Sequence, residues 1–454
     1  MKPRSRDMTV GSPLRLLTAF TLPALAGNLL NQVYSITDSI IVGRYLGQTS
    51  LAAIGVTMPI VLLTAAMVIG LNVGVGILLS QAFGRKDIGQ MRHTFANSFY
   101  LAAVIALFTT LVGLPLTVPI LKLMGTPAAP LAEAASYLHI NFATTLFPLL
   151  YYLFNNAFRG MGGSMTALWC LIVSVVINVF LDILFVAVFG WGVPGSAWAT
   201  AIAQALSVVF SAVMLYRRFP EMRLKRVDFR LDRPLLGTIT KLAVPIAVQT
   251  GFNNLGNVVV QGCINGFGEA VMAAYTAASR LGTLSLMPAE TLGSSMSVYA
   301  GQNYGAGKLG RIKKGVRASW QMNIILSVVL GGALVIFGRA SIGLFLTEPS
   351  PEVTTTAYRF LLFAAVPGIL NGVMCIYQQT LRGVGKATQA VIGGFMQLGA
   401  KVLVALLGAK VFLQLDVVWL AWPVSFVAGT IFPFFVYRRM MRGIADEEAE
   451  NPEA

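Results

Sequence analysis

The sequence predicts an all-α integral membrane protein, with twelve transmembrane helices in two six-helix lobes related by an internal parallel repeat. Three observations support this fold class. The chain of 454 residues is 56% hydrophobic and only 11% charged, whereas soluble proteins contain roughly 25% charged residues. Apolar runs of about 20 residues, long enough to cross a bilayer, recur along the whole chain. Short motifs of the first half also return in the second half.

The apolar runs divide the chain into spans in two sets of six. They cover residues 15–41, 52–80, 94–122, 132–157, 165–189 and 194–216, then 237–264, 271–300, 317–346, 354–380, 388–412 and 416–437. The first run lacks a small-residue cleavage site, so we expect a retained span and not a signal peptide. Prolines inside spans predict kinks or breaks at Pro23, Pro148, Pro245, Pro288 and Pro367.

Basic residues gather in alternate connections, such as "GRKDIGQMRH" (84–93) and "GKLGRIKKGVR" (307–317). This bias predicts that both termini are cytoplasmic, in a multi-pass protein of the plasma (inner) membrane. The net charge of +15 therefore indicates topology and not nucleic-acid binding. We expect a cytoplasmic N-terminus (1–14), an N-lobe (15–216), a cytoplasmic linker (217–236), a C-lobe (237–437) and an acidic cytoplasmic tail (438–454).

The two halves are copies with a near-constant offset. "SQAFGRKDIG" (80–89) matches "GQNYGAGKLG" (301–310), "FRGMG" (158–162) matches "LRGVG" (381–385), and Pro23 matches Pro245. The offset between partners is nearly the same in all three matches. Because each copy has six spans, an even number, both enter the membrane from the same side. Parallel repeats of this kind are typical of secondary transporters, with a central site between the halves.

Few acids lie inside the spans, and each is a functional candidate because burying it costs roughly 2.5–3.5 kcal/mol or more. Asn28, Asn31, Ser35 and Asp38 share one face of the first span, with Tyr34 beside them. Asn178 and Asp182 are one helical turn apart in "INVFLDILF" (177–185). Thr200 adds a hydroxyl in the sixth span. Such oxygens can bind a hard cation such as sodium, or the carboxylates can take up a proton.

Other polar groups inside spans are candidates for lining a substrate cavity or for bonding helices together. In the first half they are Asn155, Asn156 and Gln204, and in the second half Asn253, Asn257 and Glu290. Glu290 and Lys401 can form a structural pair. The three cysteines lack metal-ligand spacing, and no catalytic constellation appears, so neither an enzyme nor a bound cofactor is expected beyond the coupling ion.

The ordered motifs resemble those of the multidrug and toxic compound extrusion (MATE) transporters of prokaryotes. They are "TDSIIVGRYLG" (37–47), the paired Q-x-x-G segments after spans two and eight, and the paired RGxG segments after spans four and ten. The resemblance covers about residues 14–440. It implies a cation-coupled antiporter that exchanges amphipathic, often cationic, organic compounds for inward sodium or protons.

The family's ion site in the first lobe uses an Asp, an Asn and Asp pair, and a Thr, which the resemblance places at Asp38, Asn178, Asp182 and Thr200. Asn253 and Asn371 stand where some bacterial members carry acids in the second lobe, so we expect coupling to depend on the first lobe. Partners would be small-molecule drugs and membrane lipid, with the protein a monomer. A lipid-linked precursor flippase and a major-facilitator transporter are the alternatives.

Overall fold

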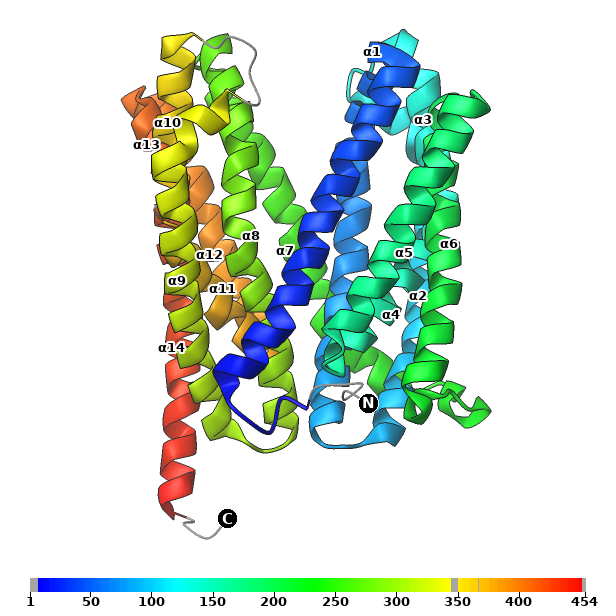
Figure 1. The fold of residues 1–454 in the computed structure, drawn as a ribbon, viewed down its shortest axis with the longest axis vertical. Helices are drawn as coiled ribbons and strands as arrows, with labels where there is room; N and C mark the ends of the chain where they lie inside the picture. Colours follow the sequence, from blue (N-terminus) through cyan, green and yellow to red (C-terminus); the bar gives the residue numbers. More distant parts are fainter. Residues whose placement is uncertain (1–6, 344–349, 366, 451–454) are drawn as a thin grey trace. The chain divides into compact units, whose positions relative to one another are not determined.

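The computed structural model describes residues 7–343, 350–365 and 367–450, and its elements within these ranges are all helical (Figure 1). The first half contains α1 (Pro13–Gly84), α2 (Ile88–Leu123), α3 (Ala128–Ala143), α4 (Leu146–Gly160), α5 (Ser164–Asp182) with the π-helical η1 (Ile183–Val188), α6 (Gly192–Arg218), and the short 3₁₀ helices η2 (Pro220–Met222) and η3 (Arg226–Phe229). The second half contains α7 (Arg233–Asn265), α8 (Glu269–Gly305), α9 (Leu309–Ile342), α10 (Pro351–Ala365), α11 (Gly368–Gly383), α12 (Ala387–Leu406) with the π-helical η4 (Leu407–Phe412), α13 (Leu415–Trp419) and α14 (Ala421–Glu450).

The backbone geometry repeats between the halves. Gly47 has φ 84° and ψ −174°, which divides α1 into two spans, and Gly268 has φ 99° and ψ 172° between α7 and α8. These two glycines occupy matching positions of the sequence repeat, and only glycine adopts this region without strain. The fifth span of each half also ends in a π-helical turn, η1 and η4. The sequence repeat is therefore a repeat of local structure.

The helices account for the predicted twelve spans. Within the described ranges, nine helices are long and apolar enough to cross a membrane, or ten when the bent pair α10–α11 is one span. The consecutive helices α3 and α4 form one more, interrupted at Thr144 and Thr145. Helix α8, with 37 residues, is long enough to cross a membrane but is too polar to count among those nine helices. It is the twelfth span.

The prolines have two different effects. Helices α1, α7 and α8 continue through Pro23, Pro245 and Pro288, so of the predicted kinks or breaks a break does not occur there. Pro148 lies in the first turn of α4, directly after the interruption, and Pro367 caps α11 where the helix axis bends by 41°. The helix is therefore interrupted near Pro148 in the fourth span and near Pro367 in the tenth span, which are matching spans of the two halves.

Two compact units form, and each contains a piece of the other half's first helix. One unit consists mainly of Leu22–Gly251, and the other combines Met8–Thr21 with the chain from Phe252 onward. The unit boundaries therefore fall inside α1 and α7, and not in the linker. In the first unit α7 packs closely on α1, because a Cβ on Gly70 would lie 2.6 Å from the carbonyl oxygen of Ala243 and from the Cβ of Ala247.

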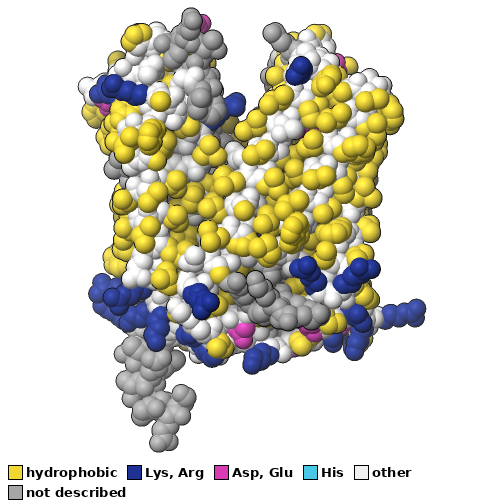
Figure 2. Space-filling model, in the orientation of Figure 1, with side chains coloured by type: hydrophobic (Ala, Val, Ile, Leu, Met, Phe, Trp, Pro, Cys, Tyr) yellow, Lys and Arg dark blue, Asp and Glu magenta, His cyan; other side chains and the backbone are white. Residues whose placement is uncertain are grey.

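Each unit has an apolar core and a largely apolar surface. Leu71, Phe95, Leu153 and Phe158 are buried in the first unit, and Phe360, Trp419 and Trp422 in the second. In each unit taken by itself, hydrophobic side chains cover the middle of the face in view, and Lys and Arg gather at one end (Figure 2). In the first unit this is the end with the α1–α2 connection, and in the second unit the end with the α8–α9 connection (Figure 1). This distribution is that of a multi-pass membrane protein.

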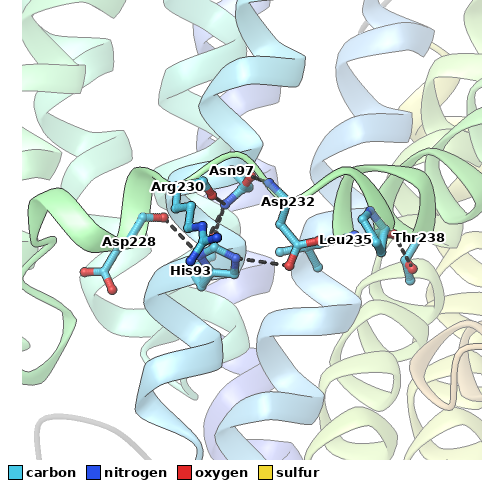
Figure 3. Close-up of polar contacts among 8 residues, drawn as sticks. His93, Asn97, Asp228, Arg230, Asp232, Leu235 and Thr238 are labelled. Carbon is cyan, nitrogen blue, oxygen red and sulfur yellow. Dashed lines mark hydrogen bonds and ion pairs between the residues drawn. The ribbon is translucent and has the colours of Figure 1, made fainter.

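The linker is held against α2 in the first unit (Figure 3). The side chain of the fully buried Asn97 donates to the carbonyl oxygen of Arg230 at 3.2 Å and accepts from the backbone N–H of Asp232 at 3.0 Å. The His93 ring lies 3.2 Å from the Asp232 carboxylate, whose other oxygen accepts from the Leu235 N–H at 3.0 Å. That N–H holds the pKa of the Asp232 carboxyl below its usual range. Asp232 therefore both caps α7 and contacts α2.

The start of the chain is held in the same manner in the second unit. The N–H of Met8 donates to the Gln302 side chain at 2.9 Å, and its carbonyl oxygen accepts from the Asn303 side chain at 3.1 Å. Met8 and Arg230 stand at the same offset as the matching prolines Pro23 and Pro245. In both units a side-chain amide therefore binds the backbone just before a first span begins.

Candidate functional site

The four predicted coupling residues all lie in the first unit and come from three helices. Asp38 lies on α1, Asn178 and Asp182 on α5, and Thr200 on α6. The i, i+4 spacing puts Asn178 and Asp182 on one face of α5, where they are 3% and 1% exposed. The structure thus brings this predicted set together inside one lobe.

Hydrogen bonds connect these residues. The Asn178 amide lies 3.2 Å from the Thr200 hydroxyl, and the Tyr34 hydroxyl lies 3.5 Å from the same group. In the orientation that satisfies its neighbours, the Asn178 nitrogen donates to Asp182 Oδ2 at 2.7 Å, and its oxygen accepts from the Thr200 N–H at 3.2 Å. The pair on α5 is therefore fixed by α6.

The two carboxylates interact directly, and one oxygen has no partner. Ser196 donates to Asp38 Oδ1 at 3.2 Å, and the carboxyl groups of Asp38 and Asp182 are in electrostatic contact. The buried Asp182 Oδ1 accepts no hydrogen bond from any described residue. Two like charges at a buried site repel one another, so a bound proton or cation would relieve the repulsion.

A cavity of about 330 Å³ lies beside this pair. Its polar lining includes Tyr34, Asp38, Tyr137, Asn141, Thr200 and Gln204, and apolar side chains such as Val61, Ile69 and Pro148 complete the wall. Apolar walls with a few polar groups are typical of small-molecule sites. Asp38 belongs both to the cavity lining and to the carboxylate pair, because it lines the cavity and contacts Asp182.

Sequence reasoning missed three residues of this region. Ser196 precedes Thr200 by four positions, so its place on the same face of α6 could have been predicted. Tyr137 and Asn141 have the same spacing on α3, but an i, i+4 pair does not show which neighbouring helix it faces.

The other predicted cavity residues are divided between the two units. Asn31, Asn155 and Asn156 line a cavity of about 150 Å³ in the first unit. Asn253, Asn257 and Glu290 belong to the second unit and are not among the described residues that line the Asp38 cavity.

The structure corrects the predicted pairing of Glu290 with Lys401. No ion pair between them occurs among the described residues. Instead, Lys401 Nζ donates to Asn257 Oδ1 at 2.8 Å and lies 4.7 Å from the centre of the Trp422 ring. An amide and an aromatic face satisfy the ammonium in place of the carboxylate.

Comparison with protein families finds the MatE family model twice, over residues 23–184 and 245–407. The two matches begin at the matching prolines Pro23 and Pro245, in agreement with the internal repeat. The chain is 30% identical over 433 residues to the probable multidrug resistance protein YoeA of Bacillus subtilis, and the match covers 93% of each chain. It is 24% identical to the multidrug export protein MepA of Staphylococcus aureus over 83% of each chain.

Solved structures of known transporters share the fold of this chain. A multidrug resistance MATE family transporter of the MOP superfamily, in an outward-facing conformation, superposes with a TM-score of 0.90 and 20% identity, over 97% of this chain and 98% of that one. A MOP superfamily transporter from Pyrococcus furiosus also gives a TM-score of 0.90 at 20% identity, over 98% and 99%. At this identity the likeness establishes the fold.

Proposed function

Because the chain belongs to the MatE family of multi-pass membrane transporters, we propose that it is a cation-coupled antiporter that exports amphipathic, often cationic, organic compounds across the plasma membrane. The names of two relatives, a probable multidrug resistance protein and a multidrug export protein, support this substrate class. The gathering of Lys and Arg at one end of each unit supports cytoplasmic termini. We further propose that a monomer is the active form.

The observation that carries the proposal is the buried, unpartnered oxygen of Asp182 beside Asp38. An acid at this depth is expensive, and the hydrogen bond from Asn178 to Oδ2 leaves the other oxygen of Asp182 without a partner among the described residues. A proton on one carboxyl, or a sodium ion among Asp38, Asn178, Asp182 and Thr200, would reduce the local charge by one. The site is therefore more stable when loaded with a cation.

Asp38 supplies the link between the ion and the substrate. It lines the 330 Å³ cavity and also belongs to the carboxylate pair. An ionised Asp38 attracts an organic cation into the cavity, and this attraction is lost when the pair takes up a proton or sodium. Ion and substrate thus weaken each other's binding, and this coupling is reciprocal. Entry of the ion from outside then favours release of the substrate there.

Ethidium efflux from proteoliposomes tests the proposal. We expect an inward gradient of either sodium or protons, imposed separately at constant membrane potential, to drive ethidium movement. The matching ionophore should stop it, since it collapses the gradient. Protein-free liposomes provide the background rate. The proposal is refuted if neither gradient raises ethidium movement above that background.

A further inference from the structure

The cavity of about 150 Å³ in the first unit has a cationic side chain in its wall. It lies between α1, α4 and α5, and Asn28, Asn31, Asn155, Asn156, Arg159 and Ser164 supply its polar lining. None of the described residues that line it carries a carboxylate. This composition is the reverse of the larger cavity, where the charged group is Asp38.

Within the described part of the chain, the Arg159 guanidinium has no counter-charge and no hydrogen-bond acceptor. The ion pairs found there involve Arg92, His93 and Arg359. Outside the helix backbone, Arg159 contributes only its carbonyl oxygen, which accepts from the N–H of Gly162. A guanidinium offers five N–H donors in a planar fork that matches a carboxylate. Here that fork is available to a ligand in the cavity.

The neighbouring asparagines add donors for the same kind of ligand. Asn155 and Asn156 each donate one N–H to the backbone carbonyl four residues earlier, at 3.0 Å. The second N–H of each amide nitrogen remains for another acceptor. Tyr151 and Tyr152 give the cavity aromatic walls. An arginine, amide donors and aromatic rings together recognise an aryl or alkyl carboxylate.

The anionic cavity and the cationic cavity are connected through shared residues. A third, smaller cavity of about 60 Å³ shares Asn31 and Tyr151 with the Arg159 cavity, and Tyr34 and Thr200 with the Asp38 cavity. Tyr152 lines all three. The first unit therefore contains a series of spaces with a positive group at one end and a negative group at the other.

We propose that Arg159 forms an anion subsite, at which the carboxylate of an amphipathic compound binds the guanidinium and the neighbouring amide donors. The substrate class rests on the proposed export function, whereas binding can be measured without any transport. A carboxylate is favoured over a bulkier phosphate because the cavity is small and Arg159 is the one charged group among its described lining residues.

The test compares two probes of similar size on the purified protein, tritiated 2-naphthoate and 2-naphthamide, by equilibrium dialysis. The two differ in charge and little in shape. We expect the wild-type protein to prefer the carboxylate by roughly ten- to a hundredfold, the usual effect of a charge-assisted hydrogen bond. Arg159→Gln should remove this preference, and Arg159→Lys should keep only part of it, since an ammonium lacks the fork.

The control is Arg382→Gln, the same change in the matching RGxG motif of the second unit, which should leave the preference unchanged. If Arg159→Gln does not give a monodisperse protein, Leu168→Trp fills the cavity wall and should abolish naphthoate binding with the arginine in place. Absence of a preference in the wild type, its survival in Arg159→Gln or Leu168→Trp, or its loss in Arg382→Gln would overturn the subsite.

A lipid headgroup is the other source of an anionic oxygen. Displacement of naphthoate by naphthoic-acid analogues but not by dioctanoyl phosphatidate supports the carboxylate assignment, and displacement by phosphatidate alone overturns it. These measurements use no ion gradient. A wild type that binds naphthoate but does not move ethidium would therefore refute export and keep the subsite, and the opposite result would do the reverse.

Discussion

Asp182 is the residue on which coupling depends in our proposal. It is 1% exposed, one of its oxygens has no partner among the described residues, and it contacts Asp38. The matching position of the repeat in the second half is Ala405, which is also buried. The shared scaffold therefore does not require an acid here, and its cost is maintained in one lobe alone.

We expect Asp182→Asn to abolish ion-driven efflux while the protein folds normally. The amide keeps the shape and can still accept from Asn178, but it can neither take up a proton nor contribute charge to a bound cation. Efflux in proteoliposomes should fall to the background rate, with an unchanged elution profile on size exclusion. Asp416→Asn is the matched control, because Asp416 pairs with Arg359 at an exposed site. Full ion-driven efflux by Asp182→Asn would remove Asp182 from the mechanism.

Among the elements, α12 carries a half-buried cation where α5 carries an amide. Lys401 occupies the repeat position of Asn178, and its ammonium binds Asn257 on α7 and the ring of Trp422 on α14. We interpret this arrangement as a fixed connection between three helices of the second unit. A tethered ammonium cannot exchange, in contrast to the ion proposed for the first unit.

A double-mutant cycle measures the coupling free energy between Lys401 and Asn257. Asn257→Leu removes the acceptor and leaves the ammonium without it, which should cost roughly 1.5–3 kcal/mol. Adding Lys401→Met should recover much of the loss, because the unsatisfied charge is then absent. The measurement is the temperature at which half of the monodisperse protein is lost in detergent. If the two losses simply add, the contact is not a coupled pair.

The linker is a second element with a specific attachment. Asn97 on α2 is fully buried and binds the backbone of Arg230 and Asp232 through both ends of its amide. We expect Asn97→Ala to release the linker, because two hydrogen bonds are lost, roughly 1–3 kcal/mol in all.

Limited trypsin digestion measures how often the linker is released from α2, because trypsin cleaves after arginine and Arg226 and Arg230 lie in the linker. Cleavage there should be about 5- to 150-fold faster in Asn97→Ala. Ser98→Ala is the matched control, because the buried Ser98 hydroxyl donates to Phe95 within α2 and does not touch the linker. Equal cleavage rates in the two variants would show that Asn97 does not hold the linker.

Over the whole molecule, sequence periodicity predicts the helices well and their neighbours poorly. Each apolar run is a local property, so the twelve spans, the repeat and the i, i+4 pair on α5 could be predicted. The partner of Lys401 could not, because Asn257 is 144 residues away and several buried polar groups were equally plausible. Tyr137 was missed for the same reason, since its role depends on how α3 lies beside α1.

The unit boundaries also differ from the predicted lobes for a physical reason. Hydropathy places a boundary at the charged linker, whereas packing places it inside α1 and α7, at Leu22 and Phe252. The beginning of α7, Arg233–Gly251, thus belongs to the first unit, and the segment Met8–Thr21 belongs to the second. Each half of the chain therefore completes the core of the other half's unit.

This exchange predicts that the two halves will associate without a covalent connection. We expect residues 1–224 and 225–454, produced together as separate chains, to co-purify through a tag on the first. Each chain would otherwise expose the apolar surface that the exchanged segment covers, and burial of that surface holds the segments in place.

Gly70→Leu provides the structural control for this experiment. Its side chain would collide with Ala243 and Ala247, where a Cβ already approaches to 2.6 Å, so it should displace the start of α7 from the first unit. We expect this variant to reduce recovery of the second chain, while the joined protein tolerates the change better because the linker keeps the local concentration high. Halves that separate in mild detergent without the substitution would show that the exchanged segments contribute little, and that the covalent linker alone keeps the two halves of the chain together.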